Sequence, residues 1–154
     1  VFNNPEGTRL LLYDELSKYQ QVIGYGKPFN NWFPTFTNYR KKIEYVSGFA
    51  FNLCPENSYY PGYYTEKPFH AKLAGSCPIY MADEYSQIDF RSQAMLNIYD
   101  FHSASILART AYSIFNDKVR LQGLLNQPLL ATMPSLEDFY WWLRITSSNI
   151  LAYH

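Results

Sequence analysis

Cysteine is scarce in this chain, and its scarcity restricts the chemistry that the chain can perform. The 154 residues include two cysteines, Cys54 and Cys77. Each lies at the end of an apolar, strand-like run, so we interpret both as buried free thiols and not as a disulfide. Neither has cysteine or histidine neighbours at the spacing of a metal site, which argues against bound zinc.

Charged residues and long hydrophobic runs are also in short supply. Charged residues make up 17% of the chain, and 13 Lys and Arg balance 13 Asp and Glu to give no net charge. This balance argues against a polyanion-binding surface and against nucleic acid as a partner. No apolar run approaches the length of a transmembrane segment, and we expect no signal peptide before the fold.

Hydrophobic and aromatic residues, in contrast, are abundant. A hydrophobic content of 47% predicts an ordered globular domain, and 154 residues fit a single domain over 1–154. The 15 Tyr and 11 Phe allow two interpretations: a Phe-rich core with a Tyr-rich surface, or a surface that a missing partner domain covers. A last helix, about 135–153, carries consecutive aromatics at 139–142. It either docks on a missing N-terminal domain or lies between two layers of this one.

Apolar periodicity predicts strands that alternate with helices. The strands are expected at 1–3, 21–24, 49–54, 77–82 and 94–99. The helices are expected at 7–19, 38–47, 65–75, 103–116, 117–126 and about 135–153, with a short helical turn within 85–90. In the 103–116 helix we expect an inward face made of Ile106, Leu107, Ala111 and Ile114. The 49–54 run is apolar along nearly its whole length, which is typical of a strand buried on both faces. This alternation predicts an α/β fold, a Rossmann-like parallel sheet flanked by helices with right-handed crossovers.

Two cations should lie at one edge of that sheet. Ligands of open α/β sheets bind beyond the carboxyl ends of the strands. Arg9 follows the first expected strand, and the polar stretch 56–67 follows the third and ends in Lys67. Thr65 is a plausible N-cap there, with Gly75 at the helix end. A helix start with an added lysine can hold a phosphorylated ligand.

The stretch 56–67 reads Glu-Asn-Ser-Tyr-Tyr-Pro-Gly-Tyr-Tyr-Thr-Glu-Lys, and Cys-Pro-Ile-Tyr follows at 77–80. This ordered run resembles the donor-binding signature of glycosyltransferase family 10, the α-1,3/α-1,4-fucosyltransferases, and the resemblance spans about 2–101. It implies the C-terminal half of a GT-B enzyme, with GDP-fucose as donor and a hydroxyl of N-acetylglucosamine or glucose in a glycan as acceptor. The family's general base lies on the N-terminal half, so the resemblance implies no catalytic residue here and inactivity of the chain alone.

The resemblance also implies roles for six residues. It places Arg9 and Lys67 on the donor diphosphate, where they would stabilise the leaving group, and Glu66 on donor hydroxyls. It makes Tyr63 a donor contact, and Asn57 a donor contact or a loop organiser. Thr65, at the start of the expected helix, is the sixth donor-binding residue. Each also has a simpler interpretation, as a solvated surface residue or a turn residue.

Several other residues have weaker expectations. The loop 24–27, with two glycines, is a candidate contact for the nucleotide base. Glu56 is expected to be structural. The pair Asp83 and Glu84 is expected on the solvated surface, and we predict no cofactor and no structural metal.

We therefore expect the donor-binding domain of an inverting fucosyltransferase. The alternatives are a non-catalytic nucleotide-sugar-binding module or subunit, and a GT-B transferase with another donor specificity. Animal members of the family carry extra cysteines near the C-terminus, and this chain does not. Their absence predicts a bacterial, cytoplasmic protein, with association to a membrane surface left open.

Overall fold

The computed structural model describes residues 7–23, 38–132, 135 and 137. Within them, three parallel strands form a sheet in the order β1–β2–β3. The strands are β1 Phe51–Leu53, β2 Cys77–Tyr80 and β3 Leu96–Asn97. Phe51 lies opposite Cys77, and Ile79 lies opposite Leu96. The crossover from β1 to β2 runs through a helix, so the predicted parallel α/β fold is confirmed.

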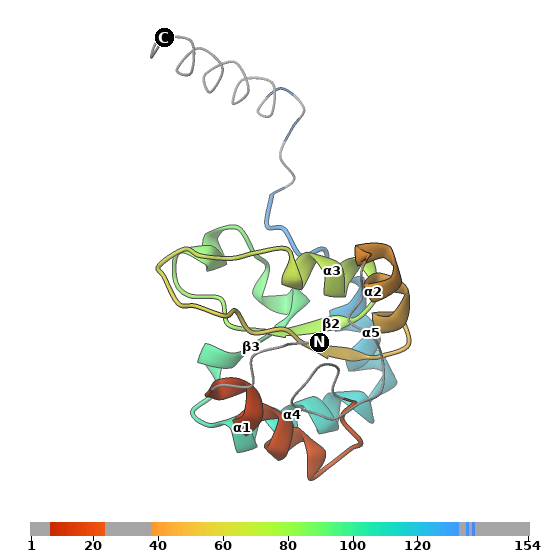
Figure 1. Cartoon of the computed structure of the whole chain (residues 1–154). Helices are drawn as coiled ribbons and strands as arrows, with labels where there is room; N and C mark the ends of the chain where they lie inside the picture. The colour runs from red at the N-terminus through yellow and green to blue at the C-terminus, as the bar shows by residue number, and fades with distance from the viewer. Residues whose placement is uncertain (1–6, 24–37, 133–134, 136, 138–154) are drawn as a thin grey trace.

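Helices cover both faces of this sheet (Figure 1). The α-helices are α1 Thr8–Ser17, α2 Tyr39–Val46, α3 Lys67–Leu73, α4 Ala104–Phe115 and α5 Lys118–Asn126. The 3₁₀ turns are η2 Ser86–Ile88, η3 Ser92–Ala94 and η4 Ile98–Asp100. Figure 1 shows α1 and α4 on one face of the sheet, and α2 and α3 on the other. The expected helices at 7–19, 38–47, 103–116 and 117–126 are therefore present, each slightly shorter than predicted.

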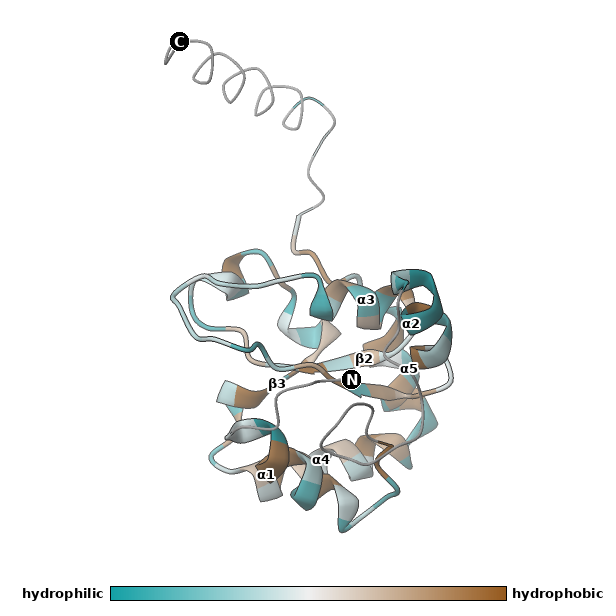
Figure 2. Ribbon diagram, in the orientation of Figure 1, coloured by the Kyte–Doolittle hydropathy of each residue, from teal (hydrophilic) through white to brown (hydrophobic). Residues whose placement is uncertain are grey.

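The strands divide their side chains between two hydrophobic clusters, as a two-residue period requires. Phe51, Leu53, Cys77 and Ile79 belong to the cluster that packs against α1, α4 and α5. Tyr80 points the other way, into the cluster with residues of α3 and η3. Figure 2 shows hydrophobic colour on parts of α1 and α4, while most of α2 is hydrophilic.

Local side-chain chemistry sets several helix ends. Asn38, Ser103 and Asp117 each accept hydrogen bonds from backbone N–H groups in the first turns of α2, α4 and α5. Gly75 follows α3 with a φ of 73°, a left-handed conformation that glycine adopts without a Cβ penalty. Gly75 was predicted in this position, and the prediction is confirmed.

The strand predictions were too long, and one was wrong. Residues 21–23 do not form a strand. β1 is half-buried and not buried on both faces, because it is the edge of the sheet that the described residues form. β3 stops after Asn97, whose side chain accepts the backbone N–H of Tyr99 and so begins η4 in place of two further strand residues.

Two helix predictions also need correction. α3 begins at Lys67, and Thr65 does not cap it, because the Thr65 hydroxyl donates to Glu56 instead. On α4, Ile106 was expected to face inward but is 44% exposed. Leu107, Ala111 and Ile114 form the buried face as predicted. The expected strand at 1–3, the glycine loop 24–27 and the helix at about 135–153, apart from Ser135 and Glu137, lie outside the described residues.

Candidate functional site

The segment Pro55–Glu56–Asn57 leaves the carboxyl end of β1 and organises the candidate site. Its direction is set by the Cys54 N–H, which donates to the Ile79 carbonyl at 3.1 Å and extends the pairing of β1 with β2. Pro55 and Glu56 are buried, whereas Asn57 is exposed. A long loop then leads to α3. The segment thus lies where ligands of open α/β sheets bind.

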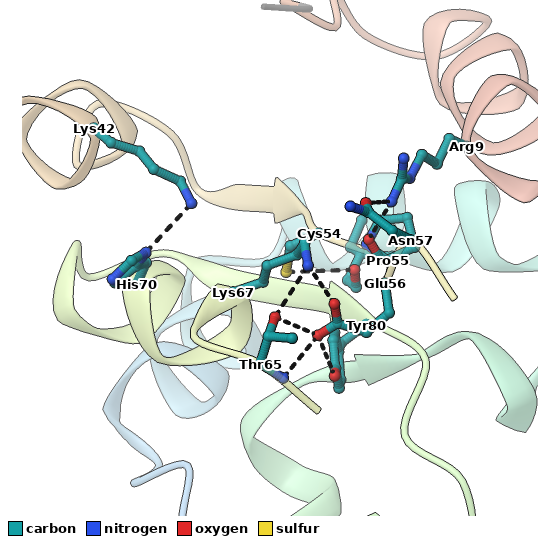
Figure 3. A network of polar contacts seen from close by, with 11 residues as sticks. Arg9, Lys42, Cys54, Pro55, Glu56, Asn57, Thr65, Lys67, His70 and Tyr80 are labelled. Carbon is teal, nitrogen blue, oxygen red and sulfur yellow. Dashed lines mark hydrogen bonds and ion pairs between the residues drawn. The ribbon is translucent and has the colours of Figure 1, made fainter. Parts of the chain in front are cut away.

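Arg9, in the first turn of α1, reaches this segment. The residue is only 4% exposed, and its guanidinium Nη2 donates to the Pro55 carbonyl at 3.2 Å and to Asn57 Oδ1. Figure 3 shows the Arg9 side chain extending from α1 to the two acceptors. Asn57, which the sequence left as a donor contact or a loop organiser, thus holds Arg9 in this structure.

Lys67, the first residue of α3, reaches the same segment from another side. Its ammonium pairs with Glu56 Oε2 and donates to Thr65 Oγ1 at 3.0 Å. The Glu56 side chain is 2% exposed and the Lys67 side chain 20%, so the ion pair lies at the boundary between core and solvent. Arg9 and Lys67, distant in the chain, therefore both contact the Pro55–Asn57 segment (Figure 3).

Glu56 is held by three further donors on its other oxygen. Oε1 accepts from the Thr65 backbone N–H at 3.0 Å, the Thr65 hydroxyl at 2.7 Å and the Tyr80 hydroxyl at 2.7 Å. The carboxylate therefore has one oxygen fixed by the core and the other turned to Lys67. Thr65, which was predicted to be a donor-binding residue, has both its backbone N–H and its hydroxyl bonded to Glu56.

Tyr80 supplies the last of these hydrogen-bond donors to Glu56. It is the last residue of β2, fully buried, and its ring packs edge-on against Phe90 at 6.1 Å. Burial, together with the neighbouring Glu56 carboxylate, raises the pKa of the Tyr80 hydroxyl. Tyr80 therefore remains a neutral hydrogen-bond donor at physiological pH. Tyr80 ends the 77–80 run that resembles the donor-binding signature, but no role was predicted for it from the sequence, because a strand tyrosine is ordinarily a core residue.

The two remaining predicted residues, Tyr63 and Glu66, are exposed and lie on the loop before α3. Tyr63 is 43% exposed, and its ring meets that of Tyr60 edge-on at 6.2 Å. Partial burial would raise the pKa of Glu66, but its own backbone N–H and the cations Lys67 and Lys42 lower it overall. Glu66 is therefore an ionised acceptor next to Lys67.

The loop before α3 is anchored by Asp83, contrary to expectation. Asp83 was predicted on the solvated surface, yet it is 8% exposed and accepts the Gly62 N–H at 2.7 Å. It also accepts the backbone N–H of Ser86 at 2.8 Å and the Ser86 hydroxyl at 2.6 Å. Gly62 has a φ of 73°, which suits glycine. The exposed Glu84 fits the surface prediction.

A cavity of about 340 Å³ lies elsewhere, beside β1, and is lined by residues of α1, α2, β1 and α4 and by 19–23. None of the six predicted site residues lines it. We therefore base the candidate site on the polar contacts at the strand ends.

Among the described residues, no cluster of three or more His, Cys, Asp or Glu side chains could hold a metal ion. None of the helices described is both long and apolar enough to cross a membrane. The absence of a cofactor remains a prediction.

Comparison with known proteins identifies relatives with one activity. The family model for the C-terminal part of glycosyltransferase family 10 (fucosyltransferase) matches residues 2–123. An alpha-(1,3)-fucosyltransferase of Helicobacter pylori is 34% identical over 154 residues, which are 99% of this chain and 31% of the relative. Human 4-galactosyl-N-acetylglucosaminide 3-alpha-L-fucosyltransferase 9 is 32% identical over 108 residues, 69% of this chain and 29% of the relative.

Solved structures give the same result. A crystal structure of an alpha1,3-fucosyltransferase with GDP-fucose matches with a TM-score of 0.70 and 28% identity, over 79% of this chain and 35% of that one. A crystal structure of an alpha1,3-fucosyltransferase with GDP matches equally well, at 0.70 and 27%, over 80% of this chain and 36% of that one. The chain thus spans about a third of the length of these proteins.

Proposed function

The chain belongs to glycosyltransferase family 10, the fucosyltransferases, and from that premise we propose that it is the donor-binding part of an inverting enzyme. The donor would be GDP-fucose, because structural neighbours were solved with GDP-fucose and with GDP. The acceptor would be a hydroxyl of N-acetylglucosamine or glucose in a glycan. The family and the α/β fold expected from the sequence are both confirmed, and the roles of the individual residues are part of the proposal.

One observation carries this proposal: Arg9 and Lys67 both contact the segment that leaves the carboxyl end of β1. A guanidinium offers donors in a fixed fork that suits phosphate oxygens, and an ammonium adds a compact charge. The two cations thus flank the edge of the sheet where a sugar nucleotide would place its diphosphate. Glu66 and Tyr63, exposed on the adjoining loop, would contact the donor's hydroxyls and sugar.

In the proposed reaction, the acceptor oxygen attacks the anomeric carbon of fucose while the bond from that carbon to the diphosphate oxygen breaks. The attack comes from the opposite face, so the configuration inverts, and GDP leaves with an additional negative charge. Arg9 and Lys67 would stabilise that charge, at about 2–4 kcal/mol for each donor by comparison with similar sites. The base that takes the acceptor proton is expected on a separate N-terminal domain, together with the acceptor site.

Calorimetric titration of the chain with GDP, UDP and ADP tests the donor assignment. We expect GDP to bind more tightly than the other two, and we expect Lys67→Met and Arg9→Lys each to weaken GDP binding by tenfold or more, the range of a charged hydrogen bond. A preference for UDP would instead indicate a GT-B transferase of another specificity. Lys41 is exposed on α2, and Lys41→Met serves as the matched control.

A transfer assay with GDP-fucose and N-acetyllactosamine tests whether catalysis requires a second domain in addition to this chain. Because the base is expected elsewhere, we predict GDP binding without turnover by this chain alone. Turnover by the isolated chain would show that its own residues suffice for the chemistry. Failure to transfer even when the chain is combined with an N-terminal domain of a relative would favour a non-catalytic nucleotide-sugar-binding module.

A further inference from the structure

We propose that Glu56 is a positioning residue, whose buried carboxylate holds the Lys67 ammonium at the edge of the sheet, ready for the donor. This inference rests on the proposed function and extends it to a residue that the sequence suggested was only structural. Glu56 does not itself need to touch the donor. Its effect on the donor would pass through Lys67.

The first argument is the asymmetry of the carboxylate's contacts. Glu56 Oε1 accepts from the N–H and hydroxyl of Thr65 and from the hydroxyl of Tyr80, at 2.7 to 3.0 Å. Those three donors fix one oxygen and hence the plane of the carboxylate. The other oxygen, Oε2, faces Lys67 and pairs with its ammonium. A flexible lysine side chain is thereby confined to one place.

The second argument concerns burial. A buried carboxylate is costly unless it is paired and hydrogen-bonded, and Glu56 is both. The Lys67 side chain is 20% exposed, so its ammonium does not need a buried partner in order to be solvated. The buried partner restricts the rotamers of Lys67, so less conformational entropy is lost when the ammonium binds a diphosphate.

The third argument is that core residues hold the Glu56–Lys67 ion pair in place. Tyr80 is fixed by the core, packed against Phe90 and at the end of the central strand. The chain of contacts therefore runs from β2 through Tyr80 and Glu56 to Lys67 (Figure 3). Through these contacts the sheet restrains the Lys67 ammonium, which lies at the end of an otherwise flexible side chain.

A double-mutant cycle tests whether Glu56 acts through Lys67. The variants are Glu56→Gln, Lys67→Met and the double substitution, with calorimetric GDP affinity as readout. Glutamine keeps the shape and an acceptor oxygen for Thr65 and Tyr80, but it removes the charge that holds the ammonium. We expect Glu56→Gln to weaken GDP binding about five- to tenfold, and to have no further effect once Lys67 is methionine.

Two results would overturn the proposal. One is unchanged GDP binding by Glu56→Gln, which would mean that the carboxylate has no net effect on the affinity, or tighter binding, which would mean that it competes with the diphosphate for Lys67. The other is an equal loss in the presence and absence of Lys67, which would mean a general structural effect. Glu84→Gln, which removes one exposed acidic group, controls for the change in net charge, and thermal melting of every variant monitors folding.

A second measurement does not depend on GDP. Acylation of Lys67 by acetic anhydride, followed by mass spectrometry, reports how firmly the ammonium is held in the free protein. We expect acylation to be several-fold faster in Glu56→Gln and, to a smaller extent, in Tyr80→Phe, while Lys41 is unaffected. Equal rates would overturn the positioning role, whereas absence of GDP binding in the wild type, with protected Lys67, would overturn only the proposed function.

Discussion

Arg9 and Asn57 are joined by a hydrogen bond that connects the start of α1 to the segment after β1. The Asn57 amide oxygen accepts from the guanidinium, and the Pro55 carbonyl accepts from the same nitrogen at 3.2 Å. Asn57 is exposed while Arg9 is buried. The exposed residue therefore sets the direction of a buried cation, and a change at either residue should affect both the fold and the site.

Arg9→Lys is expected to be a damaging substitution although it conserves charge. A lysine ammonium lacks the planar fork of the guanidinium and cannot reproduce its contacts in a buried setting. We expect unfolding free energy to fall by about 1–3 kcal/mol, the range for losing hydrogen bonds to a charged group. Urea denaturation measures the loss. Arg40→Lys, exposed in the first turn of α2, should be nearly neutral, and equal effects of the two changes would contradict the assignment.

Asp83→Asn should flatten the dependence of stability on acid pH. The hydrogen bonds from Ser86, and then that from Gly62, hold the pKa of Asp83 below its ordinary value in the folded protein. The unfolded chain therefore binds the proton at higher pH, so the stabilisation is present above the ordinary carboxyl range and is lost as pH falls through the folded pKa. Denaturation midpoints of wild type and variant, measured between pH 7 and 3, should converge at the acid end. Parallel curves would count against this role.

Lys72→Met is expected to loosen the end of α5. The Lys72 ammonium donates to the Leu124 carbonyl at 2.7 Å and the Leu125 carbonyl at 3.4 Å, in the last turn of that helix. Carbonyls at a helix end lack intrahelical partners, and a cation there is favoured by the helix dipole. We expect a loss of about 1–2 kcal/mol in unfolding free energy. Hydrogen exchange should quicken in α5 and not in α2, and Lys41→Met provides the control.

Cys54 and Cys77 should resist alkylation in the native protein. Burial raises the pKa of Cys54 to about 12 and that of Cys77 to about 11, so little of the reactive thiolate exists near neutral pH. Iodoacetamide at pH 8 should label both only after denaturant is added. Because the unfolded thiols titrate near 9.0 and the folded ones higher, stability should decline as pH rises above that value. Rapid labelling of native Cys54 would contradict its burial.

The sequence predicted the order of elements well because apolar periodicity and caps are local signals. Asp117 and Gly75 mark helix ends where they were expected. Strand lengths were overestimated, because pairing and not composition decides where a strand stops. Asn97 ends β3 through its own side chain, and an apolar run such as 94–99 does not reveal that contact.

The candidate site was predicted in part, for a comparable reason. The positions of Arg9 and Lys67 follow from the rule that ligands bind at the carboxyl ends of parallel strands. What each cation touches could not follow, because those contacts join residues far apart in the chain. Tyr80 is the example: only the fold shows that its hydroxyl turns to Glu56.

The pairing of Lys67 with Glu56 has a consequence for how a charged ligand approaches. An ammonium already neutralised by a carboxylate adds little to the electric field beyond a Debye length, about 10 Å at 0.1 M salt. With no net charge on the whole chain, little long-range attraction would draw an anion in. Lys67 would therefore discriminate among ligands after arrival and not accelerate their encounter.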